Sequence, residues 1–247
     1  MAFDSVAAIY DATFGRSPVG RLFRFRLAER ITGTAKPLSR ILDIGCGTGE
    51  DAIWLAGQGH AVLGIDASAL MIEQATAKAA RIGSTATFEC RSLQSLQASE
   101  TRFDVVVSNF GAMNCVPLST WTELVPRLLA PGGRGFVVLM GDRPLPETLR
   151  PSPPVTPRTV TASVGVGTGL VTTYYEPVSA VVASLSARVR LERVEAMGCL
   201  VPGPTYSRFP GRHPLGTCLL AMGESIVRRA AFFRDRGDHT LFEFTPR

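Results

Sequence analysis

The stretch "LDIGCGTGEDAIWLAGQGHAVLGIDAS", Leu42 to Ser68, decides the fold class of this chain. A short apolar run ends at Gly45, and Gly47 and Gly49 lead into a segment of helical composition. A second apolar run then ends at Asp66. A strand, a glycine turn, a helix and a strand with a terminal acid are typical of nucleotide-binding sheets. Glycines let the backbone approach a ligand closely, and a carboxylate at Asp66 can accept hydrogen bonds from ribose hydroxyls.

The glycine spacing leaves two nucleotide classes to compare. The dinucleotide fingerprint is G-x-G-x-x-G, but position 50, where the third glycine would fall, is Glu50. Asp43 also stands two residues before Gly45, where a dinucleotide-binding strand is usually apolar. These acids would repel a pyrophosphate and attract a cation. S-adenosylmethionine carries a sulfonium and an ammonium and no phosphate, so charge complementarity favours it.

The surrounding sequence predicts a doubly wound α/β sheet of the Rossmann-like type, mostly parallel with right-handed crossovers. Ligands of such sheets bind beyond the carboxyl ends of the strands. Between the third and fourth strands no clear helix is expected. The strands are predicted over residues 40–45, 61–66, 85–90, 103–110 and 135–140, and the helices over 49–59, 68–83 and 119–133.

The chain changes character after Met140. We expect a hairpin over 160–175 turned at 167–169, a helix over 177–187 and a strand over 188–197. A loop over 199–216, a helix over 217–237 and a last strand over 239–244 follow. We interpret residues 1–247 as a single domain. It would carry N-terminal cap helices, about 1–36, and an inserted lid, about 142–215, over the ligand face.

Composition narrows the classes of partner and location. The 247 residues are 45% hydrophobic, enough for one sizeable core, and the net charge is +5. The arginines are scattered without a long basic run, which disfavours a nucleic-acid footprint. Five cysteines without a C-x-x-C pair predict neither a metal site nor a disulfide frame. The chain shows no signal peptide and no membrane-spanning run, so we expect a cytoplasmic protein.

Four segments carry a family resemblance. "ILDIGCGTGE" (41–50) resembles the first motif of class I S-adenosylmethionine-dependent methyltransferases, and "GIDAS" (64–68) resembles their acidic second motif. "LLAPGG" (128–133) is similar to the signature before their fifth strand, and "AAIYDATF" (7–14) to the opening helix of their small-molecule members. The resemblance implies an antiparallel last strand, which 239–244 could supply.

The resemblance also implies a set of cofactor-binding residues. Asp43 and the glycine loop would hold the methionine end, Asp66 the ribose, and Ala67 would pack by the adenine. Ser92 stands where the family often has an aspartate that binds the adenine amino group. Arg21 and Arg24 could reach the cofactor carboxylate. The implied residues are Tyr10, Asp43, Gly45, Cys46, Gly47, Gly49, Asp66, Ala67, Ser92, Leu93, Asn109 and Phe110.

Methyl transfer is an in-line displacement that an enzyme promotes mainly by positioning and by exclusion of water, so no catalytic dyad is required. The catalytic candidates are His213 as a base, Asn109 near the reacting methyl group, and Tyr175 of the insertion. Asn109 and Asn114 could orient a polar acceptor or merely cap a loop. His60 and His239 are interpreted as structural.

The function predicted from these features is S-adenosylmethionine-dependent methylation of a small, largely apolar or aromatic metabolite. Prolines and aromatic side chains without a basic stripe in the insertion favour such an acceptor. An RNA or protein methyltransferase, and a cofactor-binding module without methyl transfer, remain alternatives. Both a monomer and a homodimer are compatible with the sequence.

Overall fold

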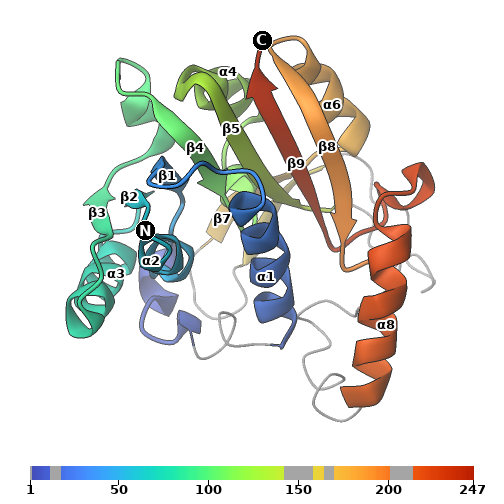
Figure 1. The fold of residues 1–247 in the computed structure, drawn as a ribbon, viewed down its shortest axis with the longest axis horizontal. Coiled ribbons are helices and arrows are strands. Elements are labelled where there is room, and N and C mark those ends of the chain that lie inside the picture. Colours follow the sequence, from blue (N-terminus) through green and yellow to red (C-terminus); the bar gives the residue numbers. More distant parts are fainter. Residues whose placement is uncertain (1, 12–17, 142–157, 164–169, 201–213) are drawn as a thin grey trace.

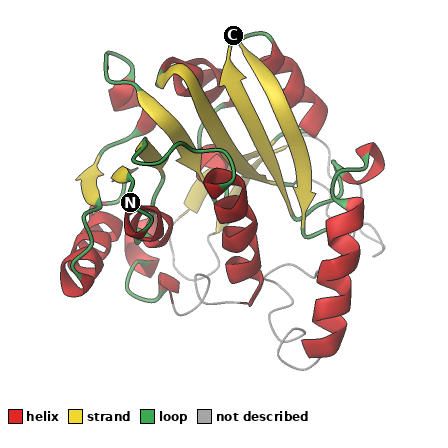
Figure 2. Ribbon diagram, viewed as in Figure 1, coloured by secondary structure: helices red, strands yellow, loops and turns green. Residues whose placement is uncertain are grey.

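The fold is a seven-stranded sheet between two layers of helices (Figures 1 and 2). The computed structural model describes residues 2–11, 18–141, 158–163, 170–200 and 214–247. The strand order is β3-β2-β1-β4-β5-β9-β8. The strands are β1 (Arg40–Ile44), β2 (Ala61–Asp66), β3 (Thr87–Cys90), β4 (Phe103–Ser108), β5 (Leu129–Met140), β8 (Val189–Met197) and β9 (His239–Pro246).

The strand directions confirm the predicted fold class. β1 to β5 pair in parallel with their neighbours, whereas β9 pairs antiparallel with both β5 and β8. The last strand is therefore the antiparallel one. The order of the parallel strands reverses at β1 and β4, where the polypeptide leaves in opposite directions, and the carboxyl ends of these two strands define the ligand edge of such a sheet.

Helices cover both faces of the sheet. On one face, Phe23, Leu27 and Ile31 of α1 pack with residues of α2, β1, β4 and β5. On the other face, Trp121 of α4 and Val181 of α6 pack with β4, β5 and β9. Burial of each such side chain stabilises the fold by roughly 1.5–3 kcal/mol. The helices are α1 (Pro18–Thr32), α2 (Glu50–Gly57), α3 (Ala69–Ile82), α4 (Leu118–Arg127), α6 (Val178–Ser186) and α8 (Pro214–Val227), with short 3-10 turns η1 (Ala2–Val6), η3 (Leu93–Leu96), η4 (Ala112–Cys115) and η6 (Ala231–Phe233).

Local signals in the sequence set several helix ends. Ser68 caps α3, since its hydroxyl accepts a hydrogen bond from Met71 N at 3.2 Å, and Gly83 ends that helix at φ +67°. These two residues are the ends of the helix predicted over 68–83. The connection from β3 to β4 holds only η3, which agrees with the expected lack of a helix there.

Two predicted helices are wrong in extent. The helix predicted over 119–133 is α4, which ends at Arg127, because Phe103 N bonds to Leu128 O at 2.8 Å and draws the chain into β5. The glycines after Pro131 lie in an irregularity of the β4–β5 pairing instead of ending a helix. The helix predicted over 217–237 begins at Pro214 and ends at Val227, after which the chain turns so that Arg228 and Arg229 contact the Glu195 carboxylate.

Part of the predicted insertion belongs to the sheet. Residues 178–197 form α6 and β8, and β8 is the edge strand beside β9. The hairpin predicted over 160–175 has its two strands, β6 (Arg158–Ser163) and β7 (Leu170–Tyr175), paired antiparallel in a separate two-stranded sheet. Its turn lies outside the described residues, as does most of the loop predicted over 199–216.

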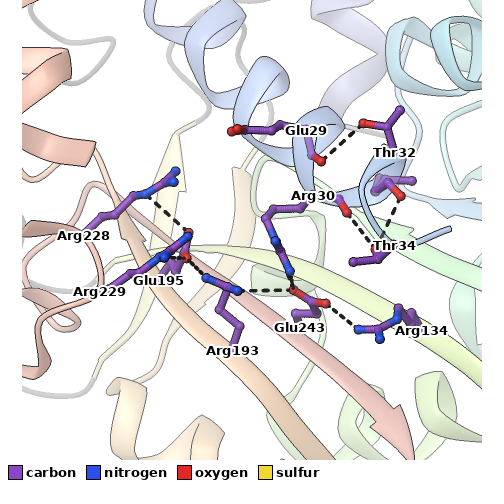
Figure 3. Close-up of polar contacts among 11 residues, drawn as sticks. Glu29, Arg30, Thr32, Thr34, Arg134, Arg193, Glu195, Arg228, Arg229 and Glu243 are labelled. Atoms are coloured by element: carbon purple, nitrogen blue, oxygen red, sulfur yellow. Dashed lines mark hydrogen bonds and ion pairs between the residues drawn. The ribbon is translucent and has the colours of Figure 1, made fainter. Parts of the chain in front are cut away.

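An ionic network ties α1 and the segment after α8 to β5, β8 and β9 (Figure 3). Glu243, 1% exposed, accepts hydrogen bonds from Arg30 at 2.6 Å and Arg134 at 2.7 Å. Glu195, 2% exposed, accepts from Arg193 at 2.6 Å and Arg229 at 2.9 Å. Buried carboxylates with several guanidinium partners are satisfied, whereas removal of one partner would leave an uncompensated charge. The network therefore fixes the edge of the sheet.

Candidate active site

The three glycines of the loop after β1 differ in their surroundings. All have positive φ, at +70° for Gly45, +53° for Gly47 and +79° for Gly49, so each uses the freedom that glycine provides. A Cβ atom at Gly45 would lie 2.2 Å from Ala112 Cβ. A Cβ atom at Gly49 would lie 2.8 Å from the Phe88 ring, whereas none of the described atoms lies within 4 Å of one at Gly47. Gly45 and Gly49 therefore permit close packing, and Gly47 alone adjoins open space that a ligand can occupy.

Asp66 is tied to the glycine loop. Its Oδ2 accepts a hydrogen bond from Gly47 N at 3.0 Å, and its Oδ1 accepts from Ser68 N at 2.9 Å. Burial raises the pKa of Asp66, and these two backbone N–H groups oppose the rise. Each oxygen retains lone-pair capacity for a further donor, which a ribose hydroxyl can supply. Ala67 follows directly, and its carbonyl accepts from the Cys90 thiol at 3.8 Å.

Asp43 is a buried carboxylate with an unsatisfied oxygen. The residue is 2% exposed, and its Oδ2 has no hydrogen-bond partner among the described residues. Burial raises the pKa of Asp43 well above its ordinary value, and the negative charge of Asp51 adds to the rise. A buried acceptor without a partner costs free energy unless a ligand satisfies it. A cationic donor is the ligand group that would best satisfy a carboxylate.

Arg24 of α1 joins the site through Asp51. Its guanidinium lies 2.8 Å from the Asp51 carboxylate, and Asn109 Nδ2 donates to the same carboxylate at 2.9 Å. The Arg24 Cζ lies 4.8 Å from the centroid of the Phe110 ring. Burial by itself would lower the pKa of Arg24, but the charge of Asp51 and the hydrogen bond to it raise that pKa. Arg24 Nε is buried and, among the described residues, has no acceptor.

The side chain of Asn109 is thus engaged with Asp51. Its Oδ1 accepts from Phe110 N at 2.9 Å, and Phe110 adopts φ +52°, which is uncommon for a residue with a Cβ atom. The sequence suggested that Arg24 could reach a ligand, but it did not show that Asp51 binds both Arg24 and Asn109. Asp51 lies in the first turn of α2, where an acid is accounted for by the helix dipole alone.

The N-terminal segment packs against the same loop. Tyr10 contacts the cluster of Val6, Ala7 and Met71, and burial raises the pKa of its hydroxyl to about 12, so the phenol stays protonated at neutral pH. The Asp11 carboxylate accepts hydrogen bonds from Thr48 and Lys78. Lys78 also forms an ion pair with Glu50. This contact partly neutralises Glu50, whose negative charge was expected to repel a pyrophosphate.

The remaining predicted cofactor residues lie close to these groups. Cys46 Sγ donates to Gly47 O at 3.7 Å, and burial raises the pKa of this thiol, so it remains protonated. Ser92 directly precedes η3, and its carbonyl accepts from Ser95 N at 3.1 Å. Leu93 is 4% exposed and packs in the core below α4. Arg91 N donates to Asp66 O at 2.9 Å, so the turn that carries Ser92 and Leu93 starts beside the end of β2.

The structure describes two of the three catalytic candidates. Asn109 follows β4, and Tyr175 ends β7 opposite Arg158, whereas His213 lies outside the described residues. His60 accepts from Ser39 N at 3.2 Å and His239 pairs with Asp238 at 2.8 Å, contacts that are consistent with the structural roles expected for both. In the described ranges no three His, Cys, Asp or Glu side chains gather in an arrangement that could hold a metal ion. No helix among the described residues is long and apolar enough to cross a membrane.

Comparisons with known proteins agree with this geometry. Residues 41–133 match the profile of a family described as a methyltransferase domain. The 2-phytyl-1,4-naphtoquinone methyltransferase of Synechococcus elongatus is 30% identical over 155 residues, which are 60% of this chain and 65% of that protein. The ubiquinone/menaquinone biosynthesis C-methyltransferase of Bdellovibrio bacteriovorus is 35% identical over 150 residues, 58% of this chain and 62% of that protein. The chain thus spans slightly less than two thirds of the length of these relatives.

A solved structure shows that the likeness in fold extends beyond the matched residues. The CcbJ methyltransferase from Streptomyces caelestis superposes with a TM-score of 0.68 over 99% of this chain and 97% of that one, at 17% identity. At this identity the likeness concerns the fold alone. It includes the helices and strands on both sides of residues 41–133.

Proposed function

We propose that this chain, whose residues 41–133 match a methyltransferase domain, is a class I S-adenosylmethionine-dependent methyltransferase and transfers a methyl group to a small acceptor. The observation that carries the proposal is a pair of unsatisfied buried atoms on two residues, Asp43 and Arg24, whose opposite charges interact. Asp43 Oδ2 lacks a donor and Arg24 Nε lacks an acceptor in the part of the chain that the structure describes. A group with an ammonium and a carboxylate would satisfy both.

The residues present fit S-adenosylmethionine. Its amino-acid end is a zwitterion, so its ammonium would bind Asp43 and its carboxylate would bind Arg24. The backbone at Gly47 provides the close approach, and Asp66 would accept from the ribose hydroxyls. Ser92 and Leu93 would contact the adenine. NAD would leave the pair of orphan atoms unsatisfied and would place its pyrophosphate beside Glu50 and Asp51.

Catalysis in this proposal is mainly positioning and desolvation. S-adenosylmethionine bound there would supply an activated methyl carbon with a neutral thioether as the leaving group. Asp51 orients the Arg24 guanidinium, and Asn109 holds Asp51 in place. Tyr10 and Phe110 exclude water, which strengthens the charged contacts. Where the acceptor is a hydroxyl, its proton would pass to a base, for which His213 is the candidate, and Tyr175 would contact the acceptor.

The names of the relatives support an aromatic, largely apolar acceptor. Two of them act, by name, on a phytyl naphthoquinone and in ubiquinone and menaquinone biosynthesis. We therefore propose a hydroxylated aromatic ring with an apolar substituent for this chain. Methylation of RNA or protein is supported only by the net charge of +5. An RNA substrate would be indicated by nucleic-acid binding that weakens steeply with salt.

Calorimetry tests the cofactor, and transfer of a labelled methyl group tests the reaction. We expect binding of S-adenosylmethionine and of its demethylated product, but not of NAD. We also expect transfer of the label to a reduced alkyl-1,4-naphthoquinone. Binding of NAD in place of both adenosyl compounds would refute the proposal. Binding of the cofactor without transfer to any metabolite of a cell extract would support a binding module instead.

The oligomeric state and location belong to the same proposal. We expect a monomer or a homodimer in the cytoplasm. A homodimer would use the apolar outer face of α8, where Leu215, Leu219, Met222 and Ile226 are each 67–81% exposed at heptad spacing. Light scattering over a range of protein concentrations distinguishes the two states, and a Leu219→Glu variant should stay monomeric.

A further inference from the structure

A single buried amide holds both ends of the segment that leaves β5 and returns as β7. Asn114 of η4 is 2% exposed. Its Oδ1 accepts a hydrogen bond from Met140 N at 2.9 Å, at the end of β5, and its Nδ2 donates to Tyr174 O at 2.8 Å, near the end of β7. Met140 is where the chain departs from the sheet, and Tyr174 is where the hairpin finishes.

The chemistry of these contacts requires an amide. The N–H of Met140 faces one end of the side chain, and the carbonyls of Tyr174 and, at 3.4 Å, Met140 face the other, so the orientation of the amide follows from its partners. The approach is close because Gly111 lacks a side chain. A Cβ atom there would lie 2.8 Å from Met140 Cγ and 3.0 Å from Asn114 Oδ1. Gly111 itself has φ +74°.

The anchored hairpin contacts η4, and η4 packs on the glycine loop. η4 follows Asn109 and Phe110 directly, and its first residue, Ala112, abuts Gly45. At the other end of η4, burial and then the charge of Asp66 raise the pKa of Cys115. Asn114 therefore connects β7 to a turn that packs on the loop beneath the proposed cofactor. In Figure 1, β7 lies by the carboxyl ends of β4 and β5.

We propose that Asn114 is a positioning residue that holds β7 and Tyr175 as the wall of the methyl-acceptor subsite. This inference rests on the proposed function, since it assigns one side of the site to the acceptor. Asn114 touches neither the proposed cofactor residues nor the acceptor. Its loss raises the acceptor concentration that the protein needs and leaves the affinity for S-adenosylmethionine unchanged.

The test uses Asn114→Asp, which is nearly isosteric and separates the accepted hydrogen bond from the donated ones. The carboxylate keeps an acceptor for Met140 N but loses the donor to Tyr174 O and the longer, 3.4 Å contact to Met140 O. We expect the KM for a reduced short-chain alkyl-1,4-naphthoquinone to rise about tenfold, as expected for loss of one buried hydrogen bond, with kcat and the cofactor Kd within twofold of wild type. Amide hydrogen exchange over residues 170–175 should quicken.

A pH series supplies a readout that a merely structural role would not produce. Burial raises the pKa of a carboxyl group, and the protonated form regains an O–H donor for Tyr174 O. The ratio of the variant KM to the wild-type KM should therefore fall toward one as the pH is lowered from 8 to about 5. A ratio that does not change with pH would overturn the proposal.

Two controls separate the possible failures. Thr122→Val removes another buried side-chain contact, the 2.8 Å hydrogen bond that joins α4 to Ser184 of α6, and should leave the KM unchanged. Where Asn114→Asp folds poorly, Asn114→Ser is measured in its place.

Binding of the naphthoquinone probe is also followed by fluorescence quenching in the presence of the demethylated cofactor. If wild type binds the probe without methylating it and the variant does not bind the probe, the proposed function is refuted but the positioning role of Asn114 is supported. Equal probe binding by wild type and variant, or no probe binding by wild type, would sink the positioning role.

Discussion

Replacement of Asp43 by asparagine should change stability and cofactor binding in opposite directions. Asp43 is 2% exposed, its Oδ2 has no partner among the described residues, and burial raises its pKa. Ionisation of this carboxylate therefore lowers the stability of the native state. With S-adenosylmethionine bound, the same carboxylate would accept a charge-assisted hydrogen bond from the ammonium. Such a bond contributes about 1.5–3 kcal/mol, so Asp43→Asn should weaken binding about 10- to 150-fold.

The effect on stability has a defined dependence on pH. A carboxyl group whose pKa is higher in the folded than in the unfolded state stabilises the fold below the unfolded pKa, 3.8, and this contribution is lost as the pH rises through the folded pKa. The asparagine has no such loss. Urea unfolding without cofactor should therefore show the variant gaining stability relative to wild type between pH 5 and pH 8. Calorimetric titration with S-adenosylmethionine at pH 8 measures the loss of affinity.

Asp104→Asn is the matched control. Asp104 is an exposed carboxylate near the amino end of β4, where its Oδ2 accepts from Arg40 N at 2.8 Å. It should leave cofactor affinity unchanged. The reasoning fails for Asp43 if its variant binds the cofactor as tightly as wild type, or if the variant loses stability relative to wild type as the pH rises.

Three further predictions follow from the same geometry. Gly47→Ala should destabilise the fold by only about 1–2 kcal/mol, because the alanine takes a positive φ in open space, yet it should abolish cofactor binding measurable by calorimetry. Gly49→Ala should mainly lower the melting temperature, because its Cβ atom overlaps neighbouring side chains. Cofactor affinity should fall as the pH is lowered, since Asp43 and Asp66 have raised pKa values and must be ionised to accept hydrogen bonds from the cofactor. Cofactor binding should therefore release protons, which calorimetry in buffers of different ionisation enthalpy measures. An affinity that does not depend on pH would contradict this prediction. Glu243→Gln should lower the free energy of unfolding in urea by up to about 3 kcal/mol, given partly exposed arginine partners, without altering the cofactor Kd.

Local sequence signals predicted the features that depend on neighbouring residues. The fold class follows from apolar runs and glycine turns that repeat along the chain, and the structure confirms it. The cap at Ser68 and the helix stop at Gly83 were predictable because each acts on residues within one turn. The end of α4 was not. Pro131 and two glycines look like a helix stop, but pairing of Leu129 with Phe103, far away in the sequence, ends the helix earlier.

The sequence by itself determined the sheet, the glycine loop and the family resemblance, because these depend on periodicity, turn chemistry and short motifs. Only the tertiary structure decided what the polar side chains do. Asn109 and Asp51 lie 58 residues apart, and Asn114 and Tyr174 lie 60 apart. Their hydrogen bonds exist because packing of α2, η4 and β7 at one edge of the sheet places a donor beside an acceptor. A sequence shows which groups a residue carries, whereas a buried partner is set by the packing of elements that are distant along the chain.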